Sequence, residues 1–217
     1  MAKVKMKKKS TRIDMTAMCD VSFLLLTFFV MTSTAKLPEP FPVITPHSTV
    51  QTKIPESNLA TITVGEDNEG KKRVFFGVTG KDVRKLMLSE MGELYKVDFT
   101  PEQTDAFSLI DFFGVDIKVL DKLIEMKGSD RNKEGVQPGI PYDSLNNQLR
   151  DWIWTARKAQ IKFVSDTCLP KEMGELHIAI KGDKDTDYPV VKKVIDILQE
   201  QGKNNFFLVT GLRGDDF

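Results

Sequence analysis

The chain has 217 residues, enough for one soluble domain and a short additional element, but hardly for two full domains with independent cores. Its 31 basic and 31 acidic residues cancel, so the composition as a whole gives no indication of nucleic-acid binding. The two cysteines, Cys19 and Cys168, exclude a disulfide framework, and we expect Cys168 to be a partly buried, inert thiol.

The chain begins with a basic segment that is followed by an apolar one. Six Lys or Arg residues lie in the first twelve positions, and residues 17–35 are apolar apart from small hydroxyl residues and Asp20. A helix of this length spans about 28 Å, close to the thickness of a bilayer core. A cleaved signal peptide is the alternative, but an acid within the apolar run favours a retained anchor. The positive-inside rule then predicts a cytoplasmic basic tail at 1–13, a transmembrane helix at 14–35 and export of the rest.

Asp20 is the one charged residue of the apolar stretch. A carboxylate at the bilayer centre costs about 2.5–3.5 kcal/mol on insertion scales, so such an acid usually faces protein or water and has a function. Helical spacing places Thr16, Thr27 and Thr34 near the same face. Desolvation favours the neutral acid, so we predict that Asp20 carries protons, with the three threonines as supporting residues of the pore face. In the alternative interpretation, a permanently neutral Asp20 only holds helices together by hydrogen bonds.

The segment after the apolar stretch is rich in proline. Residues 36–58 contain half of all prolines in the chain and should form an extended periplasmic linker. Residues 59–64 and 73–78 alternate in polarity and predict a β-hairpin. Residues 81–95 keep their apolar positions in helical register and predict a helix.

The middle of the chain has weaker patterns. Residues 108–126 predict two short helices broken at Gly114, and residues 128–141 predict a polar loop. Residues 142–160 predict the main packing helix. Its apolar face carries Leu145, Leu149, Trp152, Ile153 and Ala156. Trp152 and Trp154 cannot both face the core, so one of them lies either at a contact surface or half-buried.

The last part of the chain predicts a strand, a helix and a strand. The strands should cover residues 175–181 and 205–210, and the helix 188–201 should begin at Asp187 as its N-cap. With the hairpin, these elements predict an α+β domain over residues 59–217, in which helices cover one face of a small sheet.

No motif indicates catalysis or metal binding. His47 and His177 are the two histidines, and His177 has the apolar neighbours of a structural residue, so we expect no metal site. The sequence has neither a phosphate-binding glycine loop nor a nucleophile elbow. We therefore expect no enzyme and no cofactor, with protons as the coupling ion.

Two groups of motifs bear a family resemblance. Residues 13–21 read IDMTAMCDV and residues 24–29 read LLLTFF, while residues 178–185 read IAIKGDKD and residues 207–210 read FLVT. These segments resemble the ExbD/TolR family of proton-motive-force transducers, and ExbD most of all. The resemblance implies that Asp20 is the proton-carrying aspartate of the family.

The resemblance also implies partners and a location. Family members work in the inner membrane of Gram-negative bacteria, and we expect paired helices of a homodimer within a ring of a polytopic ExbB-like protein, together with a TonB-like energy-transducing protein. Residues 81–140 lie almost wholly in the part that shows no resemblance, so we predict that they are an insertion that modulates partner contacts and is separable from the core fold.

These observations predict a proton-channel subunit of an ExbB–ExbD-type motor that energises TonB-dependent outer-membrane transport. One apolar helix has too little polar surface to enclose a proton path, so a membrane partner is required. The alternatives are a TolR-like cell-envelope protein and a non-catalytic membrane-anchored module that binds peptidoglycan or a protein.

Overall fold

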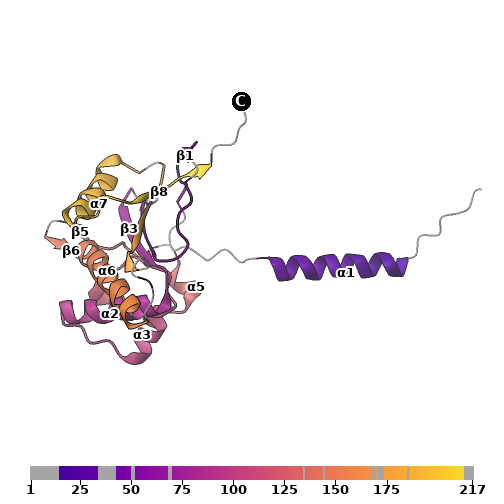
Figure 1. The fold of residues 1–217 in the computed structure, drawn as a ribbon, viewed down its shortest axis with the longest axis horizontal. Coiled ribbons are helices and arrows are strands. Elements are labelled where there is room, and N and C mark those ends of the chain that lie inside the picture. Colours follow the sequence, from indigo (N-terminus) through magenta and orange to yellow (C-terminus); the bar gives the residue numbers. More distant parts are fainter. Residues whose placement is uncertain are drawn as a thin grey trace, which may run out of the picture. The chain divides into compact units, whose positions relative to one another are not determined.

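The computed structural model forms two compact units, Met1–Pro38 and Glu39–Phe217. Figure 1 shows helix α1 of the first unit and the mixed α/β fold of the second. The structure describes residues 15–33, 43–49, 52–67, 70–133, 135–143, 145–167, 170, 174–184 and 186–212.

The described part of the first unit is helix α1, Met15–Thr32. Its 18 residues contain neither glycine nor proline, none of them is buried, and the helix is long and apolar enough to cross a membrane. The hydroxyls of Ser22, Thr27 and Thr32 donate to backbone carbonyls of the preceding turn, which satisfies these polar groups within the helix. The predicted span of 14–35 contains α1, and positions 14, 34 and 35 lie outside the described residues.

The second unit is built on a five-stranded mixed sheet. Its strands, in spatial order, are β4 (Phe112–Phe113), β3 (Lys72–Val78), β2 (Leu59–Glu66), β7 (His177–Gly182) and β8 (Phe207–Val209). The β4–β3 and β3–β2 pairs are antiparallel, whereas β2–β7 and β7–β8 are parallel. Ile62 lies opposite Phe76 on one side and Ile180 on the other, so the predicted hairpin is confirmed as the centre of the sheet.

The remaining elements are helices and two small strand pairs. The helices are α2 (Lys81–Tyr95), α3 (Pro101–Ser108), η1 (Ile117–Val119), α4 (Leu120–Glu125), α5 (Gly128–Arg131), α6 (Gln148–Asp166) and α7 (Tyr188–Glu200). The small strands are β1 (His47–Ser48) with β9 (Gly211–Leu212), and β5 (Tyr142–Asp143) with β6 (Asn146–Asn147).

The main buried cluster lies on one face of the sheet. Alternate residues of the central strands, among them Ile62, Phe76 and Ile180, share one buried cluster with the apolar faces of α2, α6 and α7. The rings of Phe107 and Phe113 pack against Trp152 at the centre of this cluster, with centroids 6.2 and 4.7 Å from it. The predicted α+β fold, with helices on one face of a small sheet, is therefore confirmed.

The start of the main packing helix differs from the prediction. Helix α6 begins at Gln148 rather than at residue 142, because β5 and β6 form a tight hairpin immediately before it. The side chain of Asn147 accepts a hydrogen bond from the Arg150 amide and so caps the helix there. Leu145 lies in this turn and is fully exposed, so its predicted core position is wrong, whereas the other four residues of the predicted face are buried.

The predicted helix pair at 108–126 is also partly wrong. Only η1 and α4 are helical after Gly114, and the residues before it form strand β4. Phe113 pairs across the strands with Phe76, which holds this segment extended at the sheet edge. Gly114 lies against the ring of Phe75, where a Cβ atom would clash, so the glycine permits a close approach of backbone to ring. The predicted loop at 128–141 contains the short helix α5.

The expectation that residues 81–140 are separable from the core is wrong. Met87 and Met91 of α2 are completely buried in the same cluster as the sheet and α6. Phe107 and Phe113, farther along this segment, complete the aromatic centre with Trp152. The segment thus builds part of the main core, while its status as an insertion relative to other family members stays a prediction.

Part of the predicted linker belongs to the second unit. His47 and Ser48 pair in parallel with Gly211 and Leu212, and the Ile44 carbonyl accepts a hydrogen bond from the Lys184 amide. The described residues between 43 and 58 contain no helix, as predicted. At the other end of the unit Asp187 occupies the N-cap position of α7, but its carboxylate binds Lys72 at 2.5 Å and makes no capping hydrogen bond.

Candidate functional site

Asp20 lies on α1 with its side chain exposed in the first unit. At 1.5 Å per residue it is about 7 Å from the helix start at Met15 and about 18 Å from the helix end at Thr32. The acid is therefore much closer to the end that the positive-inside rule assigns to the cytoplasm. A proton path through the site would be short on that side and long on the other.

The threonines of the predicted pore face are partly described. Thr16 lies one turn before Asp20 and Thr27 two turns after it, whereas Thr34 lies outside the described residues. The Thr27 hydroxyl donates to the Leu24 carbonyl at 2.9 Å, so its oxygen can accept a hydrogen bond while its proton is already used. Thr27 can thus accept a hydrogen bond from a water molecule between Asp20 and the helix end at Thr32, while it keeps its hydrogen bond to Leu24. The roles of these four residues stay a prediction.

The surroundings of Asp20 on its own helix are apolar. Residues 15–33 contain no Lys, Arg or His, so α1 itself supplies no cation to balance the carboxylate. The opposite side of the helix presents large apolar side chains, all of them exposed: Leu25, Leu26, Phe28, Phe29 and Val30. Such a helix buries these side chains in lipid or against another membrane helix, and within the described residues 15–33 no cation balances the carboxylate.

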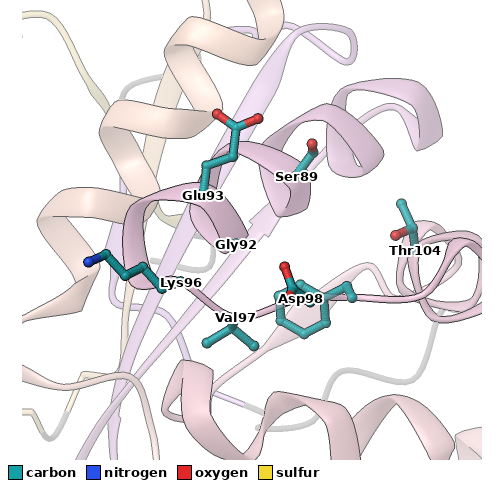
Figure 2. A pocket seen from close by; sticks show the side chains of 8 residues that line it. Ser89, Gly92, Glu93, Lys96, Val97, Asp98 and Thr104 are labelled. Carbon is teal, nitrogen blue, oxygen red and sulfur yellow. The ribbon is translucent and has the colours of Figure 1, made fainter.

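The second unit has a cavity of about 420 Å³ beside the end of α2. Ser89 and Glu93 of α2, Lys96 and Asp98 of the following loop, and Thr104 of α3 are among its lining residues. Figure 2 shows that the charged side chains of Glu93 and Lys96 point in different directions. These two charged groups therefore do not converge on one point, as the polar groups of a binding or catalytic site do.

A second cavity, also about 420 Å³, lies between the last turns of α6 and the start of β7. Its lining includes the apolar residues Ile161, Val164 and Leu176, and its rim carries the ion pair of Lys203 with Glu175 at 2.5 Å. The hydrogen bond from Lys203 lowers the pKa of the Glu175 carboxyl, with a further contribution from the lysine charge. These rim charges neutralise each other and need no ligand to explain them.

The histidines do not come together. His47 is exposed on β1, while the ring of His177, at the start of β7, packs edge-on against Phe207 with centroids 6.1 Å apart. Among the described residues, no group of three or more His, Cys, Asp or Glu could hold a metal ion. Cys168 lies outside the described residues.

The two tryptophans differ in burial, as expected. Trp152 is fully buried and Trp154 is half-exposed, which confirms that only one of them faces the core. Lys158 and Ile161 continue the exposed side of α6 beyond Trp154, although no motif in the sequence indicates them. They follow Trp154 by four and seven residues, a spacing that places all three on one side of a helix. This pattern in the sequence could have identified them.

Comparison with known protein families matches residues 6–212 to the family described as biopolymer transport protein ExbD/TolR. No curated protein and no solved structure matches the chain significantly. The family match spans both units and includes Asp20. The chain therefore belongs to the ExbD/TolR family, whose members are proton-motive-force transducers of the cell envelope.

Proposed function

We propose that this chain is the proton-carrying subunit of an ExbB–ExbD-type motor in the inner membrane of a Gram-negative bacterium, where it energises TonB-dependent outer-membrane transport. The observation that carries the proposal is Asp20, a lone carboxylate on an apolar helix without a basic residue. An acid that is held away from water and cations changes readily between charged and neutral forms when a proton arrives.

The position of Asp20 suggests how the proton step does work. Charged Asp20 must face polar groups or water, whereas neutral Asp20 tolerates an apolar surface, so each proton changes which neighbours α1 prefers. The membrane potential supplies about 2.3 kcal/mol per charge per 100 mV to this cycle. Thr27, and Thr34 by its spacing in the sequence, lie on the long side of Asp20, where we assign them to the water path from the periplasm.

The proposal includes partners, because α1 alone cannot enclose a path. A polytopic ExbB-like ring supplies the other walls, a second copy of the chain supplies the paired helix, and a TonB-like protein receives the work. Membership of the ExbD/TolR family supports this type of assembly. A TolR-like role uses the same membrane acid with a different periplasmic partner.

The deciding experiment replaces the acid with an isosteric neutral residue. Asp20→Asn should abolish proton flux in vesicles that contain the chain and its ExbB-like partner, and should abolish TonB-dependent uptake in cells. Asp20→Glu keeps a carboxyl group on the same helix face and should retain part of the activity, which makes it the matched control. Full flux in the Asn variant, at normal expression and assembly, would refute the proposal.

A second experiment separates the proton subunit from a simple anchored module. Residues 17–35 are exchanged for an acid-free apolar helix of equal length, so that the domain stays on the membrane. The proton mechanism predicts loss of uptake with normal assembly, whereas retained function would assign the chain to the anchored binding module. Copurification with a TonB-like protein then distinguishes the ExbD-like role from the TolR-like one, which uses a different periplasmic partner.

A further inference from the structure

The outward side of α6 carries large apolar side chains where a surface helix normally has polar ones. Trp154, Lys158, Ile161 and Lys162 recur at intervals that place them on one side of the helix. Trp154 is 49% exposed and Ile161 is 58% exposed, although the opposite side of α6 is buried in the core. A single exposed apolar residue needs no explanation, but two on one stripe form a surface.

Helix α2 extends this surface. It runs antiparallel to α6, since Tyr95 bonds to Asp151 while Glu90, earlier in α2, pairs with Lys158, later in α6. Leu94 follows Glu90 by one turn, and Trp154 precedes Lys158 by one turn. The two apolar residues therefore lie at the same level of the helix pair, and Leu94 is also half-exposed. We call Leu94, Trp154, Lys158, Ile161 and Lys162 the α6 face.

The charges that this face presents are positive. Lys158 and Lys162 both pair with Glu90, whose side chain is 12% exposed, while the two lysine side chains are 50% and 53% exposed. Solvent therefore meets the ammonium groups far more than the carboxylate. The Lys158 ammonium also lies 5.3 Å from the centre of the Trp154 ring, in cation–π geometry. Exposed tryptophan beside lysines and aliphatic residues is the composition of helices that lie in a membrane interface.

The bilayer is within reach of this domain. Residues 33–42 lie between the end of α1 and the first residues that bond to the second unit, and they span at most about 35 Å when fully extended. A domain of this size is about 40 Å across, so a linker of this length keeps the domain close to the membrane surface. Because α1 tethers the domain, the bilayer is present at high effective concentration, and even a weak contact is populated.

We propose that the α6 face docks on the anionic lipid headgroups of the membrane in which α1 is anchored. Trp154 and Ile161 enter the boundary between headgroups and acyl chains, and the two lysines bind lipid phosphates. The proposal rests on the membrane anchor alone and not on the proton step at Asp20. It gives the motor a resting position, in which the domain lies on the bilayer until a periplasmic partner draws it away.

The test uses the intrinsic fluorescence of the full chain in nanodiscs. The chain has two tryptophans, and since Trp152 is buried in the core, brominated lipids should quench Trp154 alone. We expect strong quenching in brominated phosphatidylcholine that contains phosphatidylglycerol, weaker quenching without phosphatidylglycerol, and none in Trp154→Phe. Equal fluorescence loss in wild type and Trp154→Phe would overturn the proposal.

Charge variants test the lipid specificity. Lys158→Gln with Lys162→Gln removes both cations without placing a new acid beside Glu90, and should weaken docking by roughly 25-fold at about fivefold per lysine. Lys118→Gln with Lys122→Gln is the matched control, because these lysines are also exposed and four residues apart but lie outside the α6 face. Equal effects of the two pairs would contradict the proposal.

Two further outcomes separate the alternatives. If Trp154 is unquenched in lipid and its emission shifts only when membrane or periplasmic partner proteins are added, the α6 face binds a protein and the lipid proposal is wrong. Asp20→Asn should leave the quenching unchanged, so failure of the proton mechanism and failure of lipid docking give different results.

Discussion

Helix α1 and the α+β unit use apolar side chains in opposite ways. In α1 every described residue is at least partly exposed, including phenylalanines and leucines that the second unit would bury. In the second unit, residues of comparable size such as Phe76 and Met87 are completely buried against the sheet and helices. The comparison shows that hydrophobicity in α1 matches an external apolar environment, whereas in the second unit it builds an internal core.

This difference predicts where substitutions act. Changes in α1 should alter proton transfer and assembly while the second unit keeps its stability. Changes in the core of the second unit should alter folding whether or not the membrane helix is intact.

The largest expected effect comes from replacing residues 81–140 with a short Gly/Ser linker. The deletion removes the buried face of α2 and two of the rings around Trp152. The free energy of burial lost with them exceeds the stability of about 5–15 kcal/mol that a typical domain has. We expect an unfolded or aggregated second unit by circular dichroism and proteolysis of the full chain in detergent. An acid-free apolar helix in place of residues 17–35 is the control and should leave the second unit folded. A stable deletion variant would show that the segment is separable after all.

Trp152→Ala should destabilise the second unit by about 3–5 kcal/mol, because it leaves a cavity between Phe107 and Phe113. Trp154→Ala, two positions along the same helix, should cost less than about 1 kcal/mol because its ring is half-exposed. Urea unfolding followed by circular dichroism measures both variants. Similar losses in the two variants would mean that Trp154 is also a core residue.

Tyr95→Phe should cost about 1 kcal/mol, because it removes the hydrogen bond to Asp151 between α2 and α6. Burial, and then that hydrogen bond, raises the pKa of Tyr95 above its usual range. The unfolded tyrosine ionises near pH 10, so this contribution is complete below about pH 10 and is lost as pH rises toward the folded pKa. Stability of wild type and Tyr95→Phe should therefore converge at alkaline pH. A constant difference between the two from pH 8 upward would contradict this assignment.

The smallest expected effect is that of Asp20→Asn on folding. Asp20 lies in the first unit and makes no contribution to the buried cluster of the second, so the urea midpoint of the second unit should be unchanged. The same variant should lose proton flux. A shifted midpoint would show that the membrane helix and the α+β unit are energetically coupled and do not act separately.

The sequence by itself determined the elements whose signals are local. Helix α1 followed from a continuous apolar run, the β2–β3 hairpin from alternation around a polar turn, and α2 from helical periodicity. The bounds of α2 agree with the structure, those of the two strands differ by one or two residues, and α1 ends at Thr32 within the predicted span of 14–35. The proposed role of Asp20 also needed no tertiary information, because a charged residue in an apolar helix is conspicuous in the sequence alone.

Only the tertiary structure decided which apolar residues form the core. Leu145 and Leu149 fit the same helical face in the sequence. In the structure Leu145 lies in the β5–β6 turn and is exposed, whereas Leu149 lies on α6 and is buried. Phe113 became a strand residue because Phe76, far away in the sequence, lies opposite it. Residues 81–140 joined the core because α2 packs against α6, a contact between segments about 60 residues apart. Such long-range contacts override local preference, since the free energy of burial depends on neighbours that a sequence pattern does not identify.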